Sequence, residues 1–348
     1  MKKIKTLSVI GHFGNGKTKL NGQTVKTKIV TDELCKHLGN DEVLEFDTAG
    51  GKSTLLKSPF QSFKALKQAK NVIIFPAHNG LRVYVPLLTA FRKFFKNRKL
   101  HYIVIGGWLP KFLKTRKGLA KKLQLFDGIY VETNTMKRAL EKQGFTNIVV
   151  MPNCKDLKIL KPEELVYPTE EPYKLCTFSR VMKEKGIEDA VNAVKEVNEA
   201  AGRTVYMLDI YGQIDSTQTQ WFENLQTMFP DYINYKGVVD YDKSVDVLKN
   251  YFALLFPTHF YTEGIPGTII DAYAAGVPVI CSKWESFVDL VDDGITGFGY
   301  DFLNQKQFVY LMKSLRKEQI DKIKINCLSK GKSYLPNNAI EIVKSRLN

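Results

Sequence analysis

The chain has 348 residues, a formal net charge of +15 and 44% apolar residues, which predicts two globular domains that can each bury a core. No apolar run approaches the roughly 18 residues of a membrane-spanning helix, and the first apolar stretch breaks at Gly11 and His12, so we expect neither a transmembrane helix nor a signal peptide. The five cysteines are scattered without C-x-x-C spacing, which indicates a reducing cytoplasm and argues against disulfides and a cysteine zinc site.

Short β-like runs alternate along the chain with longer amphipathic stretches. One such stretch, residues 23–38, places Val30, Leu34 and Leu38 at helical spacing. This alternation predicts an α/β fold, with parallel sheets that helices cover on both faces. The expected strands are residues 6–10, 43–46, 71–75, 102–106, 128–132 and 147–151 in the first half, and 174–179, 205–212, 234–239, 252–257 and 277–281 in the second.

The polar, Pro-rich stretch "VYPTEEPY" at 166–173 begins no regular element and is the expected domain linker. We therefore expect one doubly wound, Rossmann-like domain over residues 1–166 and another over 167–336, with a last helix at 337–348 that packs back on the first domain. Open α/β sheets bind ligands at the carboxyl ends of their strands. Two such domains that face each other would leave a cleft for two substrates.

The stretch "GHFGNGKT" at 11–18 fits the phosphate-binding pattern G-x-x-x-x-G-K-[ST]. In a P-loop the Lys and Thr begin a helix, but here a turn that ends at Gly22 separates Lys17 from the helical periodicity. No nearby strand ends in the Asp that would help to hold magnesium. We therefore interpret the stretch as a glycine-rich turn in which Gly16 and Gly22 let a donor substrate approach the backbone, and "GGKST" at 50–54 as a loop.

The strongest functional signal lies in residues 257–300. Glu263 and Asp271 are eight residues apart, and a Gly/Pro turn between them opens a helix. A helix N-terminus offers free N–H groups and a positive dipole end, which suits a diphosphate. Glu263 precedes this terminus, where it can meet sugar hydroxyls, and Asp271 lies about two turns along the helix, where it can bind a ribose diol. The segment expected to bind the donor is Gly264, Ile265, Pro266, Gly267 and Thr268.

These residues resemble the E-x7-E region of retaining glycosyltransferases of family 4 (glycosyl transferases group 1), which have the GT-B fold, although the second acid here is Asp271 rather than Glu. "FSRVMKEKGIEDAVNAV" at 178–194 resembles the R-x4-K-G element of that family, with Arg180 and Lys185 as its cations. "IYGQI", which contains Gly212, resembles a strand end that frames the nucleotide base. The match is specific in the second half of the chain and looser in the first.

The resemblance implies two Rossmann-like domains that face a cleft, and transfer of a sugar from a nucleotide-diphosphate donor, with a UDP-sugar favoured. Arg180 and Lys185 are implied to hold the diphosphate, by bidentate and point-charge contacts respectively. With the amides of the turn after Glu263 as preorganised donors, such a site needs neither a metal ion nor a cofactor. Front-face attack, in which the leaving phosphate takes the proton of the acceptor, is implied to retain the configuration while Glu263 positions the donor sugar.

Three histidines follow or adjoin these elements. His78, in "IIFPAHNGLR", follows an expected strand, and the resemblance implies a catalytic contact with the donor sugar; a surface or packed histidine is the alternative. His12 follows the first strand in the same way, and His259 lies near Glu263, which it would support. "DYD" at 240–242 has the spacing of a metal-bound nucleotide site, but its position before a helix favours helix capping.

The positive charge is concentrated in residues 48–126, which contain 17 Lys and Arg and no Asp or Glu. Residues 91–102 and 109–126 mix these cations with Phe and Leu, and basic amphipathic segments lie on anionic membranes. No nucleic-acid-binding motif accompanies the charge, and a solvated lysine-rich face is the plain alternative. We expect a cytoplasmic enzyme, peripheral on the inner face of the membrane, whose acceptor is a saccharide or a lipid-linked sugar in bacterial surface polysaccharide assembly.

Two other functions stay open at this point. A sugar-nucleotide epimerase of the same fold would bind the diphosphate and need no acceptor. A non-enzymatic nucleic-acid or anion-binding module would use only the basic half of the chain. Turnover of sugar nucleotides, and its dependence on an acceptor, distinguishes the three functions.

Overall fold

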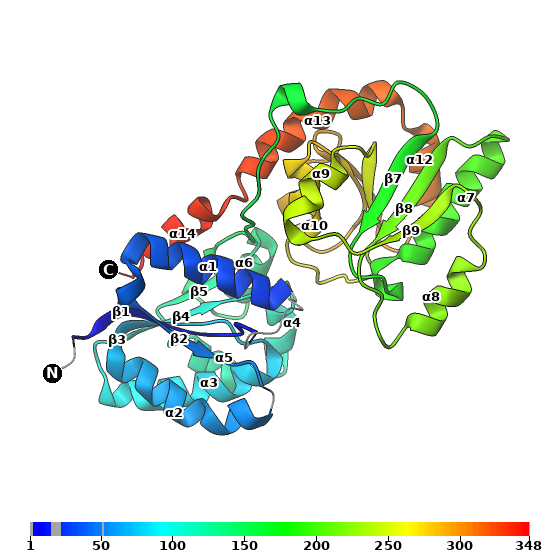
Figure 1. Cartoon of the computed structure of the whole chain (residues 1–348). Coiled ribbons are helices and arrows are strands. Elements are labelled where there is room, and N and C mark those ends of the chain that lie inside the picture. The colour runs from blue at the N-terminus through cyan, green and yellow to red at the C-terminus, as the bar shows by residue number, and fades with distance from the viewer. Residues whose placement is uncertain (1–2, 15–21, 51, 348) are drawn as a thin grey trace. The chain divides into compact units, whose positions relative to one another are not determined.

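The computed structural model describes residues 3–14, 22–50 and 52–347 (Figure 1). The chain forms two compact units: unit 1 comprises residues 1–156 and 334–348, and unit 2 comprises residues 157–333. The first boundary precedes the stretch 166–173 because Leu160 already donates a backbone hydrogen bond to Ala274 O (3.0 Å), within unit 2. In the described residues, no helix is long and apolar enough to cross a bilayer.

Unit 1 contains a six-stranded sheet in which every neighbouring pair is parallel. The strand order is β2-β1-β3-β4-β5-β6, so the winding direction reverses between β1 and β3. In a doubly wound sheet this reversal is the switch point where a ligand crevice opens at the carboxyl ends of the strands. The strands are β1 (Lys5–Gly11), β2 (Val43–Asp47), β3 (Ala69–Ile74), β4 (Lys99–Ile103), β5 (Gly128–Val131) and β6 (Ile148–Val150).

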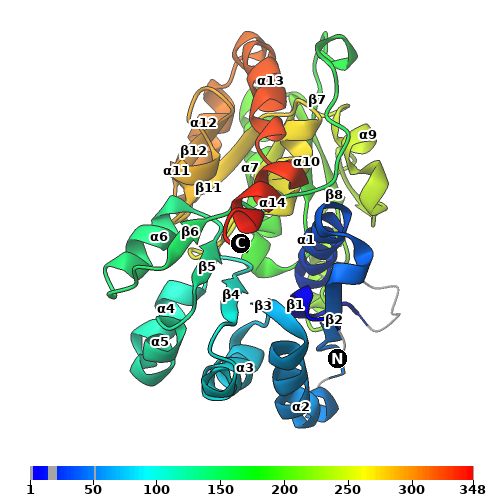
Figure 2. The same ribbon diagram turned by 90° about the vertical axis from the view of Figure 1, so that its left-hand side faces the viewer.

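Helices cover both faces of this sheet. Helices α1 and α14 pack on one face, and α2 to α6 pack on the other, so that α1 and α2 lie on opposite sides of β1 and β2 (Figure 2). The helices of unit 1 are α1 (Gly22–Leu38), α2 (Lys52–Gln68), α3 (His78–Phe91), α4 (Leu109–Lys114), α5 (Lys117–Leu123), α6 (Asn134–Glu141) and α14 (Pro336–Lys344), with 3-10 turns η1 (Asn40–Glu42) and η2 (Arg92–Phe94).

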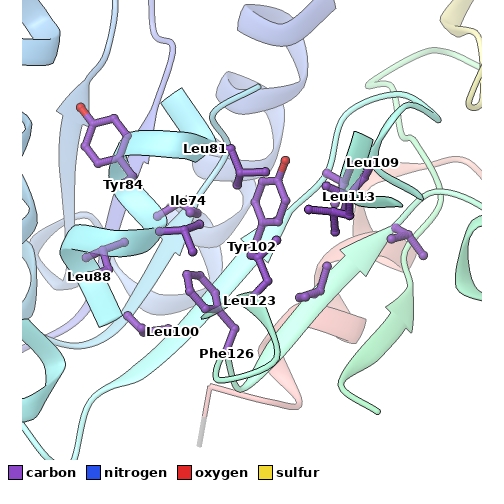
Figure 3. Close-up of a cluster of buried hydrophobic side chains, with 14 of the residues drawn as sticks. Ile74, Leu81, Tyr84, Leu88, Leu100, Tyr102, Leu109, Leu113, Leu123 and Phe126 are labelled. Atoms are coloured by element: carbon purple, nitrogen blue, oxygen red, sulfur yellow. The ribbon is translucent and has the colours of Figure 1, made fainter. Parts of the chain in front are cut away.

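The core under α3, α4 and α5 fixes the start of α3. Side chains from β3, β4 and these helices pack together in the close-up of this cluster (Figure 3). Tyr102 is fully buried there and donates its hydroxyl to Pro76 O (3.1 Å), while Tyr84 donates to Gln61 Oε1 (2.6 Å). The tyrosine hydroxyls thus tie the segment before α3 and the helix α2 to the same apolar core, as buried polar groups require.

Unit 2 repeats the architecture with a second six-stranded parallel sheet. Its order, β12-β11-β10-β7-β8-β9, is that of a Rossmann fold, and its switch point lies between β7 and β10. The strands are β7 (Tyr173–Phe178), β8 (Tyr206–Tyr211), β9 (Ile233–Gly237), β10 (Ala253–Phe256), β11 (Val279–Lys283) and β12 (Gly297–Asp301).

The helices of unit 2 alternate with these strands, and α7 and α8 lie beside β7, β8 and β9 (Figure 1). A buried apolar cluster joins α7, α8 and α12 to the sheet. The helices are α7 (Ile187–Ala201), α8 (Thr219–Gln226), α9 (Ser244–Leu248), α10 (Gly267–Ala274), α11 (Phe287–Leu290), α12 (Gln305–Ser314) and α13 (Lys317–Lys332), with 3-10 turns η3 (Pro162–Glu164), η4 (Lys183–Lys185) and η5 (Tyr241–Lys243).

The predicted α/β fold with two doubly wound parallel sheets is confirmed, and each of the eleven predicted strands overlaps an observed one. The prediction of a loop over 50–54 is wrong from Lys52 onwards, because α2 begins there. Residues 52–54 form the first turn of α2, and the last turns of this helix bury Ala65 and Leu66 in the core. Strand β12 was not expected, and its sequence, "GFGYD", contains two glycines and an aspartate, which are depleted in strands.

Candidate active site

The predicted site in unit 2 lies at the switch point of its sheet. Arg180 and Lys185 follow β7, and Glu263 follows β10, the two strands between which the winding reverses. Loops that leave neighbouring strands at a switch point diverge to opposite faces of the sheet and open a crevice between them. The topology therefore brings the two predicted motifs together, although 78 residues separate Lys185 from Glu263.

Close backbone packing fixes the turn that presents Lys185. Gly186, the next residue, has a φ of +69°, and a Cβ atom at this position would lie 1.9 Å from the carbonyl oxygen of Pro257. Only glycine accepts both the positive φ and this approach. The loop after β7 thus lies directly against the loop after β10, and His259 N donates to Glu184 O (2.8 Å) beside this contact.

Lys185 and Glu263 form an ion pair. Lys185 Nζ lies 2.8 Å from Glu263 Oε2, and the two side chains are 16% and 20% exposed. The same carboxylate oxygen accepts a hydrogen bond from Thr258 Oγ1 (3.3 Å). Lys185 Nζ also lies over the rings of Phe256 (5.3 Å) and Phe260 (5.1 Å), where a cation is attracted to the aromatic faces. The half-buried pair holds a cation and an acceptor-only carboxylate at a defined position.

The N-terminus of α10 follows Glu263. Its N-cap is Pro266, which makes no side-chain capping hydrogen bond, so no side chain of the described residues caps the first amides of the helix. Within the part of the chain that the structure describes, the buried hydroxyl of Thr268 also has no hydrogen-bond partner. A buried, unpaired hydroxyl beside uncapped amides is unfavourable without a ligand, and an anionic oxygen would satisfy both.

Arg180 lies in the loop after β7 and contacts the loop after β8. Its guanidinium Nη1 lies 3.4 Å from Asp215 Oδ2, and its side chain is largely exposed. The hydroxyl and the amide of Thr217 lower the pKa of Asp215, and the charge of Arg180 contributes further, so Asp215 stays ionised. Gly212 donates its amide to Gly237 O (2.8 Å) and accepts from Tyr235 Oη (2.9 Å), which closes the strand ends predicted to frame the base.

The second acid of the motif is more enclosed than the first. Asp271 lies in α10 and is 3% exposed, whereas Glu263 precedes the helix and is partly accessible. His259 bonds to Asp189 Oδ2 (2.7 Å) of α7, so its imidazole is attached to the adjacent helix rather than to Glu263. The expected support of Glu263 by the His259 side chain is therefore wrong; Thr258 provides it instead.

The predicted residues of unit 1 lie at the switch point of its own sheet. His78 is the first residue of α3, directly after β3, and stacks on Trp108 with ring centroids 3.9 Å apart. Burial against the aromatic rings lowers the pKa of His78, and the charges of Arg82 and Arg116 lower it further, so the imidazole is neutral at pH 7. His12 follows β1, where its Nδ1 lies 2.8 Å from Thr24 Oγ1.

The glycine-rich stretch after β1 is described only in part. Gly22 begins α1 and has open space around it, while Gly16 and Lys17 lie outside the described residues. At 240–242, Asp240 occupies the N-cap of η5, but its carboxylate accepts no capping hydrogen bond, so side-chain capping is wrong here. In residues 3–14, 22–50 and 52–347, no three His, Cys, Asp or Glu side chains are grouped to hold a metal ion.

Several contact residues of these sites were not predicted. Asp215 and Phe256 reach Arg180 and Lys185 only through the pairing of β7 with β8 and β10, whereas Thr258 reaches Glu263 from five residues earlier in the same loop. Each lies at or just after a strand's carboxyl end, which is the one signal that could have indicated them.

Known proteins resemble this chain in fold, and one protein family matches most of unit 2. Residues 165–329 match the family described as glycosyl transferases group 1, and no curated protein matches the chain. Sucrose-phosphate synthase from Thermosynechococcus elongatus is similar in structure, with a TM-score of 0.74 at 15% identity over 98% of this chain and 97% of that one. The lipopolysaccharide outer core galactosyltransferase WaaB has a TM-score of 0.72 at 16% identity over 98% of both chains.

A variant of S. aureus TarM, solved with Fondaparinux, alpha-GlcNAc-glycerol and UDP, has a TM-score of 0.66 at 15% identity. The match covers 85% of this chain but only 59% of TarM, so the chain spans about three fifths of that protein. The chain has the two-domain α/β fold of the GT-B glycosyltransferases, and the segment that matches the glycosyl transferases group 1, residues 165–329, carries Arg180, Lys185, Glu263 and Asp271.

Proposed function

We propose that the protein is a retaining glycosyltransferase that moves a hexosyl group from a nucleotide-diphosphate sugar to a saccharide or lipid-linked acceptor. The observation that carries this proposal is the 2.8 Å pair of Lys185 and Glu263 at a switch point, inside the segment that matches a glycosyltransferase family. A cation for the diphosphate and a carboxylate for sugar hydroxyls then meet in one place. UDP is the favoured nucleotide, and TarM was solved with UDP.

The chemistry requires stabilisation of a leaving diphosphate. The bond between the anomeric carbon and the β-phosphate oxygen breaks, and the acceptor oxygen bonds to that carbon on the same face, which retains the configuration. The proton of the acceptor moves to the leaving phosphate oxygen. Lys185, Arg180 and the uncapped end of α10, with Thr268, would bind the negative charge that develops. Glu263 would accept hydrogen bonds from the donor sugar, and Asp271 from the ribose.

Two cations near an uncapped helix end supply the charge that a metal ion would otherwise provide, so we propose a reaction without a metal or cofactor. The neutral His78 imidazole in unit 1 can accept or donate a hydrogen bond to a sugar hydroxyl without adding charge. We assign it a contact with the donor sugar.

A donor screen tests the transfer. The protein is incubated with a panel of UDP-, GDP- and ADP-sugars, with and without oligosaccharide and lipid-linked acceptors, and nucleotide release is measured. We expect release from one donor class that rises when an acceptor is added. Interconversion of the sugar without acceptor would establish an epimerase instead, and no response to any sugar nucleotide would reject an enzyme of this class. A product of inverted anomeric configuration by NMR would reject retention.

The acceptor side is proposed from a surface of α2 and η2. Leu56, Phe60 and Phe63 follow one face of α2 at helical spacing, and Leu56 (84%), Phe60 (68%) and Phe94 (77%) are largely exposed. Lys64 Nζ lies 5.8 Å from the ring of Phe60, within the segment that lacks acidic residues. Apolar side chains among lysines are typical of helices at an anionic bilayer surface.

We therefore propose a cytoplasmic protein, peripheral on the inner face of the membrane, that glycosylates a lipid-linked acceptor during bacterial surface polysaccharide assembly. The name of WaaB, a lipopolysaccharide galactosyltransferase, offers a precedent for such an acceptor on this fold.

A further inference from the structure

Unit 1 contains a basic cavity to which the proposed function assigns no role. It is a shallow pocket, open to the surface, between α3 and the corner where α4 leads into α5, and its volume is about 340 Å³. Three cations and three small or apolar residues line it: Arg82, Pro86, Arg116, Gly118, Leu119 and Lys122. All of them belong to the segment that has no Asp or Glu.

The two arginines are held by one aromatic ring. The guanidinium carbon of Arg116 lies 4.0 Å, and that of Arg82 5.3 Å, from the ring centroid of Phe112. Arg116 is fixed further, because its Nη1 donates to Phe112 O (2.9 Å) and Thr115 Oγ1 (3.0 Å). Phe112 itself is buried against Trp108, at a centroid distance of 5.1 Å. Both guanidinium groups therefore lie beside the same buried ring, and both residues line the cavity.

Among the described residues, no carboxylate forms an ion pair with Arg82, Arg116 or Lys122. In the described part of the chain, Asp127 is the first acid after the basic segment, and it pairs with Arg92 at 3.0 Å. His78 packs on the same Phe112 ring at 5.0 Å, and the charges of Arg82 and Arg116 add to burial in lowering its pKa. Like charges held together without a counterion repel, and a bound anion would relieve that repulsion.

We propose that this cavity binds a phosphate or diphosphate group, with Arg82 and Arg116 as its main ligands and Lys122 at its rim. Guanidinium groups form paired hydrogen bonds with phosphate oxygens, and two of them match a doubly charged group better than a monovalent one. The apolar walls, Pro86 and Leu119, fit a group that is attached to an apolar chain. This suggests the phosphate of a lipid acceptor, and that identification alone rests on the proposed function.

Calorimetric titration with pyrophosphate tests the site in its simplest form. We expect Arg82→Gln and Arg116→Gln each to weaken pyrophosphate binding about 10- to 100-fold, the effect of losing a charge-assisted contact. The control is the pair Lys93→Gln and Lys96→Gln, exposed cations of the same acid-free segment that do not line the cavity. Thermal melting verifies that every variant is folded. An equal loss of pyrophosphate affinity in the test and control variants would overturn the proposal. So would a wild-type protein that binds neither pyrophosphate in this titration nor the vesicles described below.

His78 provides a second readout that does not depend on activity. Its imidazole titration is followed by NMR with and without pyrophosphate. A bound anion offsets the positive field of Arg82 and Arg116, so the pKa of His78 should rise on binding. The rise should be absent in Arg116→Gln. If the pKa of His78 is the same with and without saturating pyrophosphate, the anion binds elsewhere, and the assigned site is contradicted.

A vesicle measurement identifies the source of the phosphate. Binding is compared between vesicles that contain phosphatidic acid, a phosphate monoester, and vesicles of matched charge that contain phosphatidylglycerol, a diester. Tighter binding to phosphatidic acid that disappears in Arg82→Gln supports a lipid phosphate. Equal binding to both, combined with Arg-dependent pyrophosphate binding, supports a soluble phosphate. Neither result depends on sugar-nucleotide turnover, so failure of the proposed transferase and failure of this site are separate outcomes.

Discussion

The ammonium group of Lys185 lies 2.8 Å from Oε2 of Glu263, and this contact joins the loops after β7 and β10. The residues come from the two motifs that suggest a phosphate-binding cation and a sugar-binding carboxylate. Thr258 donates to the same carboxylate, and the two side chains are mostly buried. The pair is therefore set before any donor arrives, and a donor would enter a preformed arrangement of charges.

Loss of the site cations should impair turnover without unfolding the protein. Lys185→Ala and Arg180→Ala each remove positive charge where the leaving diphosphate is proposed to bind, so we expect turnover to fall about 100- to 1,000-fold. Arg180 is largely exposed, so its removal should leave the melting temperature unchanged. Nucleotide release under saturating donor measures the effect.

Lys183→Ala is the matched control, because Lys183 lies in the same 3-10 turn but directs its Nζ over the ring of Trp221, at 5.7 Å. It should keep turnover within about threefold of wild type. If Lys183→Ala and Lys185→Ala lose activity alike, the effect comes from the turn as a whole, and the role of Lys185 is refuted.

The sequence predicts a strand well where the strand is a short apolar run and poorly where close packing of backbones selects glycine. Strands such as β3 and β10 are short apolar runs and were predicted, whereas β12 was not. A Cβ atom on Gly297 would lie 2.3 Å from Val279 O, so the fold requires glycine where strand propensity disfavours it. The sequence pattern of apolar and polar side chains does not indicate this close contact between the backbones of Gly297 and Val279.

The candidate site divides in the same way. Glu263 and Lys185 stand out because their spacing to Gly-rich turns follows a motif, and the structure brings them together. Asp215 has no such spacing, and its contact with Arg180 exists only once β7 and β8 are paired. Thr258 lies five residues before Glu263 in the same loop, but no motif marks it. Sequence patterns indicate which charges are used, while the side chains that orient them depend on tertiary packing.

Thr268 offers a test in which stability and binding change in opposite directions. Its buried hydroxyl has no partner among the described residues, so Thr268→Val should raise the free energy of unfolding by about 1 kcal/mol. The same change removes a donor to the diphosphate and should weaken donor binding about tenfold. Denaturant unfolding and calorimetry measure the two effects.

Ser282→Ala is the comparison, because the Ser282 hydroxyl is buried and donates to Thr258 O (2.8 Å). That variant should lose about 1 kcal/mol of stability. A Thr268→Val protein that is destabilised as Ser282→Ala is would show that the Thr268 hydroxyl has a structural partner and is not reserved for a ligand.

Gly186 should tolerate no side chain. Its φ of +69° disfavours any L-residue, and a Cβ would lie 1.9 Å from Pro257 O. Gly202 has a similar φ of +64° but open space around it, so Gly202→Ala isolates the backbone strain, about 1–2 kcal/mol. Gly186→Ala should cost a further 1–3 kcal/mol or so, because the clash is with backbone. Equal losses in urea unfolding would mean that the two loops can separate freely.

Apolar side chains on α2 and η2 should govern membrane binding together with charge. The triple variant Leu56→Ser, Phe60→Ser, Phe94→Ser removes three exposed apolar groups and should weaken binding to phosphatidylglycerol vesicles about tenfold or more. Sedimentation with anionic and neutral vesicles measures it. The control, Met228→Ser with Tyr310→Ser, changes exposed apolar residues of unit 2 and should have no effect. Binding of the wild type to neither vesicle, or to both equally, contradicts the membrane proposal.

A buried ion pair in unit 1 connects α1 to the loop that supports His78. Lys26 Nζ lies 2.7 Å from Glu132 Oε1, with the side chains 3% and 2% exposed. The same oxygen accepts the amide of Gly106 (3.1 Å), two residues before the Trp108 that stacks on His78. Glu132→Gln keeps an acceptor for Gly106 but leaves Lys26 without a charged partner, so it separates hydrogen bonding from charge compensation.

We expect Glu132→Gln to lower the free energy of unfolding by about 3–5 kcal/mol, because desolvation of the Lys26 ammonium is then no longer offset. The double variant Lys26→Met, Glu132→Leu removes both charges and should recover most of that loss, since an apolar pair of similar volume needs no compensation. Guanidinium unfolding compares the three proteins. If Glu132→Gln keeps the stability of the wild type and only the double variant loses it, the hydrogen bond to Gly106, rather than the paired charge, is what the fold requires at this position.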